Sequence, residues 1–383
     1  MPLPCIIVGG GPAGAACAIE LARKGRRAIL LEKTRTAHHK VCGEFISADA
    51  RNFLAELGVD IWSLGATQVA ALSLACGAQV PHIALPFAAA GLSRFCLDEA
   101  LLRTAWEAGA EVVRGETVTS LDTGANPIMV HTSGKKFRAA SVVLATGKHD
   151  LRGCIRPRGS MTSFKLHLRV SPAAAAMLRN LVHLTIFPGG YAGACLVERE
   201  IAAICWVMEP ELLKRIGASW QAQTRYLSVQ SDFYGKMLAH AQPLWNRPVA
   251  VAAIPYGFVR KRPISQAIYP IGDQLAVIPS FTGGGISIAL HSGIAAARAI
   301  LAGTPASEFQ RTVTARLRRQ MTWAKAGNLA LSTSAGQRLS AVMARTLPSA
   351  AARIIPFMVN ATALQLPPIV NKLEFLSIEW DTT

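Results

Sequence analysis

The chain has 383 residues, 51% of them hydrophobic, and a formal net charge of +17. This length and apolar fraction suit two or three structural units with a sizeable core, and they exclude a disordered or fibrous protein. Basic residues concentrate in 33–40, 260–262 and 311–325, but they do not alternate with aromatic residues and no nucleic-acid motif accompanies them. We therefore expect no nucleic-acid partner. A solvated basic face, an anionic membrane surface, an acidic carrier protein and a phosphate-bearing substrate are the alternatives.

The eight cysteines are scattered and form no C-x-x-C pair, which favours reduced thiols in a cytoplasmic protein. The nine histidines and the carboxylates never fall at ligand spacing, so we expect no metal site. The apolar N-terminal run lacks a basic region and a cleavage site, and this favours a strand over a signal peptide. Residues 354–370 are apolar but contain three prolines, so we expect no transmembrane span; peripheral membrane association stays an option.

The first elements form a strand-helix-strand unit. Residues 3–8 are an apolar run that ends in glycines, residues 12–24 have apolar residues at helical spacing, and residues 27–32 are a second apolar run. Further along we expect a helix at 95–109, strands near 111–121 and 128–133, and a buried parallel strand in 139–148.

The later part of the chain changes character. Residues 160–250 contain alternating stretches that predict a mostly antiparallel sheet, and 271–302 is a second glycine-rich strand-to-helix junction. The predicted fold class is α/β, α+β overall, with a Rossmann-like dinucleotide-binding domain. We place that domain in 1–75, 90–160 and 250–305, a substrate domain in 160–250 with part of 76–90, and a helical C-terminal region in 306–383.

A glycine-rich turn joins the first strand to the first helix. Gly9, Gly11 and Gly14 form the pattern G-x-G-x-x-G in the strand-to-helix context that this pattern requires. Gly9 permits the tight turn, Gly11 lets the backbone approach a pyrophosphate, and Gly14 lets the helix pack on the strand. Glu32 ends the second strand, where its carboxylate can accept hydrogen bonds from an adenosine ribose. These residues predict a dinucleotide site, with the helix N-terminus facing the phosphates.

A second nucleotide-facing motif lies far downstream, which a nicotinamide enzyme would not need. Gly272-Asp273 is followed by 283–286, three glycines and Ile286, before another helical pattern. Here the chain resembles the flavoprotein superfamily typified by p-hydroxybenzoate hydroxylase, and within it the geranylgeranyl-reductase-like branch. The resemblance implies FAD as cofactor, with NAD(P)H or another reductant as electron donor.

Other stretches carry the same resemblance. Residues 40–44 resemble the branch's segment beside the flavin, Arg94 the arginine that reaches FAD, and Val118 the position that meets the adenine. Residues 145–148 resemble the strand end that closes the FAD domain. The cofactor-binding residues that the resemblance and the motifs imply are Gly9, Gly11, Pro12, Ala13, Gly14, Glu32, Lys33, Lys40, Cys42, Gly43, Glu44, Arg94, Val118, Gly147, Gly272, Asp273, Gly283, Gly284, Gly285 and Ile286.

The chain departs from the branch at two places near the expected flavin. Gln274-Leu275 stands where the family usually has small residues, and Gly43-Glu44 replaces the paired glycines of the reductases. These departures bear on the substrate and the type of reaction, whereas FAD binding is expected in either case.

Four residues are candidates for contact with substrate or flavin. Cys42 is a candidate to tune the flavin or donate a proton, or else a small packed side chain. Tyr191, in a segment that resembles the branch's P-x-G-Y stretch over the active site, is a candidate for hydrogen bonding or a core aromatic. Lys165 and His167 lie two apart on a predicted strand, hence on one face, where they line a pocket or a solvated surface; the pattern favours the solvated surface.

By resemblance, we expect flavin-mediated redox chemistry on an apolar small molecule. The favoured reaction is reduction of a carbon-carbon double bond in a prenyl, lipid or polyketide substrate, with the flavin performing the chemistry and the protein binding and orienting it. The alternatives are a monooxygenase that uses NAD(P)H and oxygen, and a flavoprotein cyclase or isomerase without net redox. The chain lacks the W-x-W-x-x-I-P stretch expected of a halogenase, which makes hydroxylation the better version of the monooxygenase alternative.

Overall fold

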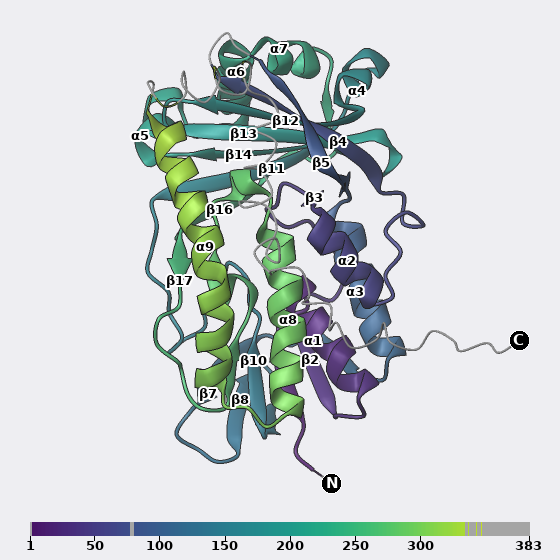
Figure 1. Cartoon of the computed structure of the whole chain (residues 1–383), viewed down its shortest axis with the longest axis vertical. Helices are drawn as coiled ribbons and strands as arrows, with labels where there is room; N and C mark the ends of the chain where they lie inside the picture. Colours follow the sequence, from purple (N-terminus) through teal and green to yellow (C-terminus); the bar gives the residue numbers. More distant parts are fainter. Residues whose placement is uncertain (1, 77–79, 334–335, 337–341, 343–345, 347–383) are drawn as a thin grey trace, which may run out of the picture.

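Short apolar runs form a five-stranded parallel sheet in the computed structural model, which describes residues 2–76, 80–333, 336, 342 and 346 (Figure 1). The strand order is β18-β10-β1-β2-β6, and every neighbouring pair is parallel. The strands are β1 (Cys5–Val8), β2 (Ala28–Glu32), β6 (Glu111–Arg114), β10 (Ser141–Leu144) and β18 (Ile268–Pro270). This order confirms the predicted strand-helix-strand unit and the predicted buried parallel strand.

Successive residues of the parallel sheet point to opposite layers. Ile7, Leu30 and Val143 pack into the core beneath the helices, whereas Ile6 and Ile29 pack on a small antiparallel sheet. The helical layer consists of α1 (Pro12–Arg23), α2 (Ala48–Glu56), α3 (Arg94–Glu107), α8 (Gly285–Leu301) and α9 (Ala306–Ser332). The small sheet contains β7 (Val118–Asp122), β8 (Ile128–Thr132) and β9 (Lys136–Ala139).

A nine-stranded sheet lies above the parallel sheet in Figure 1. Its order is β15-β11-β14-β13-β12-β4-β5-β3, and β16 also pairs with β11. The pairing of β4 with β12 is parallel, and the other described pairings are antiparallel. The strands are β3 (Phe45–Ile46), β4 (Thr67–Cys76), β5 (His82–Gly91), β11 (Met161–Arg169), β12 (Asn180–Phe187), β13 (Gly190–Val197), β14 (Ile201–Met208), β15 (Gln242–Pro243) and β16 (Val249–Ile254).

The sheet differs from the prediction in two ways. Residues 67–75, which we assigned to the dinucleotide-binding domain, belong to β4 and pair within the nine-stranded sheet. The sequence did not indicate this, because the partner strand β12 lies about a hundred residues further along the chain. Residues 160–250 also contain helices, which cover one face of the sheet and enclose a second apolar core. They are α4 (Pro172–Leu178), α5 (Pro210–Ile216), α6 (Trp220–Gln230) and α7 (Asp232–Leu238). The domain division itself stays a prediction.

Two long helices follow the late glycine motif. A short sheet of β17 (Phe258–Val259) and β19 (Ala276–Val277) precedes α8, and α9 runs beside α8 (Figure 1). The predicted fold class, a Rossmann-like domain with a second sheet and a C-terminal helix, is confirmed. The rest of the expected helical region, including its prolines, lies outside the described residues. In the part of the chain that the structure describes, none of the helices has the length and apolarity needed to cross a membrane.

Candidate functional site

The turn between β1 and α1 has the geometry of a phosphate cradle. Gly9 has a φ of 111°, and a Cβ at Gly14 would lie 2.0 Å from the carbonyl oxygen of Gly9, so glycine is required at both positions. Gly11 caps α1 without a side-chain hydrogen bond, which leaves the N–H groups of the first turn open to a ligand. The predicted glycine motif therefore forms a helix N-terminus suited to a pyrophosphate.

Glu32 lies at the edge of a pocket beside this turn. Its carboxylate accepts hydrogen bonds from the N–H groups of Gly10, at 2.8 Å, and Thr34, at 3.0 Å. Burial alone would raise the pKa of Glu32, but the charge of Lys40 and these N–H groups hold the pKa below its ordinary value, so the side chain is ionised at neutral pH. The pocket is open to solvent and is lined by Glu32, Thr34, His38, Lys40, Phe95, Asp98, Glu99, Leu102 and Arg114.

Cations surround the turn and are held in place by one buried carboxylate. Asp98 pairs with Arg94 at 2.7 Å and with Lys40 at 3.0 Å, and the Arg94 guanidinium lies 3.4 Å from where a Cβ on Gly11 would be. Burial would raise the pKa of Asp98, but these two cations lower it. Asp98 was not predicted, although its spacing of four residues from Arg94 on a helix is a recognisable signal.

The late motif packs directly on the first helix. Gly272 would place a Cβ 3.1 Å from the side chain of Ala13, and Gly293 of α8 would place one 2.2 Å from the Ala13 carbonyl oxygen. Gly284 caps α8 without a side-chain hydrogen bond, so a second helix start is open. The two glycine motifs, predicted independently of each other, thus meet in the fold.

Lys148 links the early and late segments; the sequence prediction included it in the 145–148 strand end but not among the cofactor-binding residues. Its Nζ lies 3.3 Å from the Val41 carbonyl oxygen and 3.4 Å from Asp273 Oδ2. Arg156 is buried and donates to the Asp273 carbonyl oxygen at 2.9 Å. The available signal for Lys148 is its position just after Gly147, at the carboxyl end of a parallel strand, where ligands bind in such folds.

Gln274, one of the two departures in the late motif, is fully buried. Its Nε2 donates to the carbonyl oxygens of Gly147, at 2.9 Å, and His149, at 3.0 Å. Among the described residues its Oε1 has no hydrogen-bond partner, which is costly for a buried acceptor. At two other predicted cofactor-binding positions, Gly43 and Gly285, an added Cβ would meet nothing within 4 Å. A buried unpartnered acceptor, open glycines and surrounding cations fit a polar, anionic dinucleotide.

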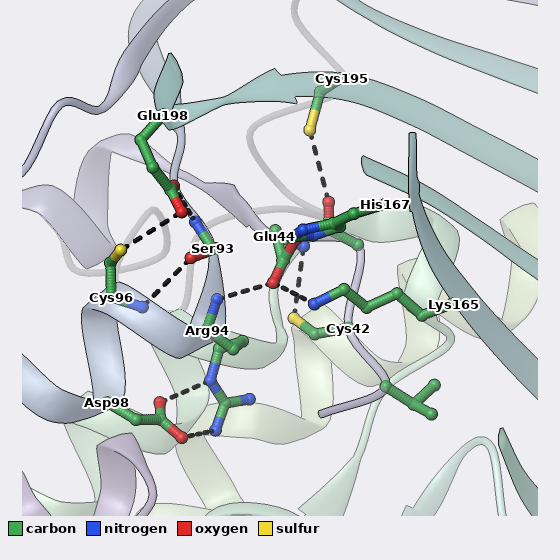
Figure 2. Close-up of polar contacts among 12 residues, drawn as sticks. Cys42, Glu44, Ser93, Arg94, Cys96, Asp98, Lys165, His167, Cys195 and Glu198 are labelled. Carbon is green, nitrogen blue, oxygen red and sulfur yellow. Dashed lines mark hydrogen bonds and ion pairs between the residues drawn. The ribbon is translucent and has the colours of Figure 1, made fainter. Parts of the chain in front are cut away.

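The Glu44 network joins the segment after β2 to the nine-stranded sheet (Figure 2). The Glu44 carboxylate is fully buried. It accepts hydrogen bonds from Lys165 Nζ and, at 2.6 Å, from the backbone N–H of Arg94, and it lies 2.5 Å from His167 Nε2. Burial would raise the pKa of Glu44, but the charge of Lys165 and the contact with His167 lower it. Glu44 has a φ of 59°, a left-handed conformation that costs a non-glycine residue energy.

The structure corrects our reading of Lys165 and His167. They share a face of β11, as their spacing predicts, but the favoured solvated surface is wrong, because they are only 0% and 3% exposed. That face points towards the dinucleotide-binding half, and Glu44 lies against it. Their burial could not be predicted from the neighbouring sequence, because the carboxylate that compensates it comes from more than a hundred residues away in the chain.

His39 completes a cluster that spacing along the chain did not suggest. Its ring lies 4.9 Å from that of His167 and 4.2 Å from that of Trp245, measured between centroids. Burial, followed by the charges of Lys165 and His167, lowers the pKa of His39 to about 4, so the ring is neutral at pH 7. The nitrogen and oxygen atoms by which His39, Glu44 and His167 could bind a metal ion lie within 4.8 Å of one another. The Glu44 carboxylate, however, is already paired with the Lys165 ammonium.

Cys42 lies next to Gly43 in the chain, whereas Tyr191 of β13 contacts the segment before the late glycines. The Cys42 sulfur accepts from the Glu44 N–H at 3.4 Å, and Cys195 donates to the Gly43 carbonyl oxygen at 3.5 Å. The Tyr191 hydroxyl contacts the Ser280 hydroxyl, just before the late glycines, and burial raises the pKa of Tyr191 to about 12. Both side chains therefore border the predicted flavin region, and their roles stay predictions.

Two predicted cofactor residues lie away from this group. Val118 is in β7, half-buried against the apolar layer below the parallel sheet, and the Lys33 side chain is exposed. Among the described residues neither forms a hydrogen bond or ion pair with the glycine turn. The Glu116 N–H donates to the Glu32 carbonyl oxygen at 3.1 Å and so brings the start of β7 towards the pocket. Their contacts with FAD stay predictions.

These features define an FAD-dependent oxidoreductase, and comparisons with known proteins agree. The chain belongs to the pyridine nucleotide-disulphide oxidoreductase family, whose model matches residues 3–194. It is 28% identical over 311 residues to a digeranylgeranylglycerophospholipid reductase of Methanosphaera stadtmanae, a match that covers 76% of this chain and 75% of that protein. A menaquinone reductase of Mycolicibacterium smegmatis is 26% identical over 40% of this chain and 39% of its own length.

Solved structures share the fold at low sequence identity. A geranylgeranyl bacteriochlorophyll reductase-like protein from Thermoplasma acidophilum has a TM-score of 0.74 at 19% identity, covering 97% of this chain and 98% of that chain. A flavin-dependent brominase has a TM-score of 0.75 at 16% identity, covering 93% of each chain. The predicted membership of the FAD-dependent superfamily, with a geranylgeranyl-reductase-like relative, is confirmed.

Removing the Glu32 carboxylate is expected to weaken FAD binding. We expect Glu32→Ala to raise the Kd for FAD at least about tenfold, because a hydrogen bond to a charged group contributes about 1.5–3 kcal/mol. Titration of the apo-protein measures this Kd. Glu107→Ala, on the exposed side of α3, is the matched control. An unchanged Kd in Glu32→Ala would contradict the assignment of this pocket to the adenosine ribose.

The Glu44 network predicts a specific order of stabilities. Glu44→Ala leaves Lys165 buried without its partner and is expected to cost about 3–5 kcal/mol in the free energy of unfolding. Adding Lys165→Met should recover most of this loss. Glu44→Gly should be about 1 kcal/mol more stable than Glu44→Ala, because glycine tolerates the left-handed backbone. Urea unfolding measures all four proteins, and equal stabilities for the single and double variants would refute the ion pair.

The same network predicts acid sensitivity. The folded-state pKa of Glu44 lies below its ordinary value of 4.5, so its contribution to stability is fully present above that pH. The contribution is lost as the pH falls through the lower, folded-state value. The stability difference between the wild type and Glu44→Gln should therefore shrink between pH 5 and pH 3. A difference independent of pH in this range would contradict an ionised Glu44.

Proposed function

We propose that the protein reduces a carbon-carbon double bond of an apolar substrate, in the first instance a prenyl or other lipid chain and otherwise a polyketide. When bound, FAD accepts and passes on a hydride, which is the chemistry that the amino-acid side chains lack. The chain's own residues hold the cofactor, line the substrate cavity and keep a proton available near it.

The observation that carries this proposal is an apolar strip that begins at the late glycine motif. Phe45 lies against Gly283, and Phe281 packs with Tyr191 and the neighbouring leucines. From there apolar side chains continue over β4, β5 and β12. The strip consists of the buried Ile83, Leu184 and Ile186 and the partly exposed Phe45, Leu72, Leu74, Leu85, Phe87 and Phe281. The partly exposed members are large apolar side chains that suit contact with a long hydrocarbon ligand.

Tyr191 is the best-placed side chain to hold a proton beside this strip. Its ring packs into the strip while its hydroxyl contacts Ser280, which also lies 2.7 Å from the Tyr256 hydroxyl. With a pKa of about 12, the hydroxyl stays protonated at neutral pH. Reduction of a double bond requires a proton as well as a hydride. Cys42 is the alternative proton donor.

The relatives support a lipid substrate and leave its delivery open. One relative is a digeranylgeranylglycerophospholipid reductase and another a menaquinone reductase, and both names describe reduction of molecules with isoprenoid chains. We propose a cytoplasmic enzyme that receives electrons from NAD(P)H or another reductant. It would receive its substrate from an acidic carrier protein or at an anionic membrane surface.

A monooxygenase is the second candidate. The polar side chains of Lys165 and His167 lie on the same sheet face as the strip, and polar anchors next to an apolar wall suit a smaller aromatic substrate. A flavoprotein cyclase or isomerase, which needs no reductant, is the third.

Product analysis under two atmospheres separates these functions. With FAD, NAD(P)H or dithionite, and a polyprenyl lipid, we expect anaerobic product heavier by two hydrogens per double bond, together with no lipid-stimulated oxygen uptake in air. Lipid-stimulated oxygen uptake with oxygen found in the product would refute the reductase and support the monooxygenase. Conversion without any reductant would support the isomerase.

A charge placed in the apolar strip tests the substrate class. Leu74→Asp puts a carboxylate in the apolar strip, and we expect kcat/KM for a lipid to fall at least about tenfold because burying an uncompensated charge is costly. FAD affinity should be unchanged. Val229→Asp, at an apolar position of α6 that is 78% exposed, is the matched control. Equal lipid kinetics in both variants would place the substrate elsewhere.

A further inference from the structure

The outer face of α9 carries a line of exposed cations. Arg311, Arg318 and Lys325 follow one another at intervals of seven residues, which places them on nearly the same side of a helix. The opposite side packs into the main core through Val313 and Leu317. From Arg311 to Lys325 the line is about 21 Å long. Among the described residues, no salt bridge pairs these three side chains with an acidic group.

A basic loop extends this surface beside the helix. Gln310 donates to the Arg260 carbonyl oxygen at 2.9 Å, and the Lys325 stem lies next to Gly257, so this loop runs along α9. Lys261 and Arg262, which follow Arg260, have exposed side chains. We call the exposed cations Arg311, Arg318, Lys325, Lys261 and Arg262 the basic face.

The sequence keeps acidic residues away from the basic face. After Glu308, in the first turn of α9, no Asp or Glu occurs until Glu374, whereas nine Lys or Arg residues occur in 309–373. A solvated helix surface usually mixes both charge signs, which lowers its electrostatic potential. The net positive potential here therefore cannot be balanced within the helix.

An apolar side chain is exposed on the same helix. Leu329 is 70% exposed and follows Lys325 by four residues, which places it on the side of the helix that carries the cations. An apolar side chain among cations is typical of helices that lie in the interface of an anionic bilayer, where the cations meet lipid phosphates and the apolar group enters the boundary layer.

We propose that the basic face docks the protein on an anionic lipid bilayer. The inference rests on the proposed function only in that an apolar lipid substrate resides in such a bilayer. A straight basic line with an exposed apolar group matches an extended negative surface, and each cation near such a surface contributes to attraction. An acidic carrier protein would need a matching set of carboxylates along the same length. Such a carrier is the alternative partner that the experiment must distinguish from a bilayer.

Vesicle binding tests the proposal without turnover. The FAD-loaded full chain is sedimented with vesicles of phosphatidylcholine, with and without phosphatidylglycerol, at low and physiological salt. We expect binding only to the anionic vesicles, weakened by salt. The triple variant Arg311→Gln/Arg318→Gln/Lys325→Gln should bind at least about tenfold more weakly. Lys24→Gln/Lys135→Gln/Lys136→Gln, which removes three exposed cations elsewhere, should bind like the wild type.

The outcomes separate the alternatives. No binding to anionic vesicles, or equal binding by the two triple variants, overturns the docking proposal. Loss of turnover with a carrier-bound substrate in the α9 variant, without vesicle binding by the wild type, overturns it in favour of an acidic protein. If the protein reduces a lipid in detergent but does not bind vesicles, the docking proposal is refuted and the proposed reductase function is retained. Vesicle binding without lipid reduction would refute the proposed function and retain the docking proposal.

Discussion

A single buried carboxylate holds the two halves of the molecule in register. Glu44 belongs to the segment that follows β2, yet its oxygens bind Lys165 and His167 of the nine-stranded sheet and the first N–H of α3. The residue adopts a left-handed backbone conformation to reach them. Such strain persists only where the surrounding contacts fix it, and it concentrates at functional positions. The contact ties the buried face of β11 to the segment between β2 and β3, and so to the half of the molecule that carries the glycine turn.

The sheet face that Glu44 contacts has a polar part and an apolar part. Over β11, buried polar groups surround Glu44, whereas over β4, β5 and β12 the side chains of this face are apolar. Lys40, Arg94 and Lys148 lie along the dinucleotide side, each paired with a carboxylate that keeps it in position. Positive charge is therefore arranged before any anion binds, which lowers the cost of reorganisation.

The sequence predicted what depends on local chain geometry. Gly9 and Gly14 could be recognised because close backbone approach leaves no room for a side chain, and Gly272 because its φ of 55° favours glycine. The early and late motifs also each precede a helix. The spacing of Lys165 and His167 indicated a shared face, but not its burial, because the compensating Glu44 is remote in the chain. Lys148 and Asp98 were not predicted as cofactor-binding residues for a similar reason: their roles depend on partners brought together by folding.

Strand β4 has a consequence for how the protein can be divided. It lies before α3 in the chain, but it forms the parallel neighbour of β12 at the middle of the nine-stranded sheet. A fragment of residues 160–250 would therefore lack β3, β4 and β5, and would expose the edge of β12 with its apolar side chains. Open edges of this kind pair with other chains and aggregate. The nine-stranded sheet is completed by strands from an earlier part of the chain. Residues 160–250 are therefore not a unit that can be excised or exchanged between relatives.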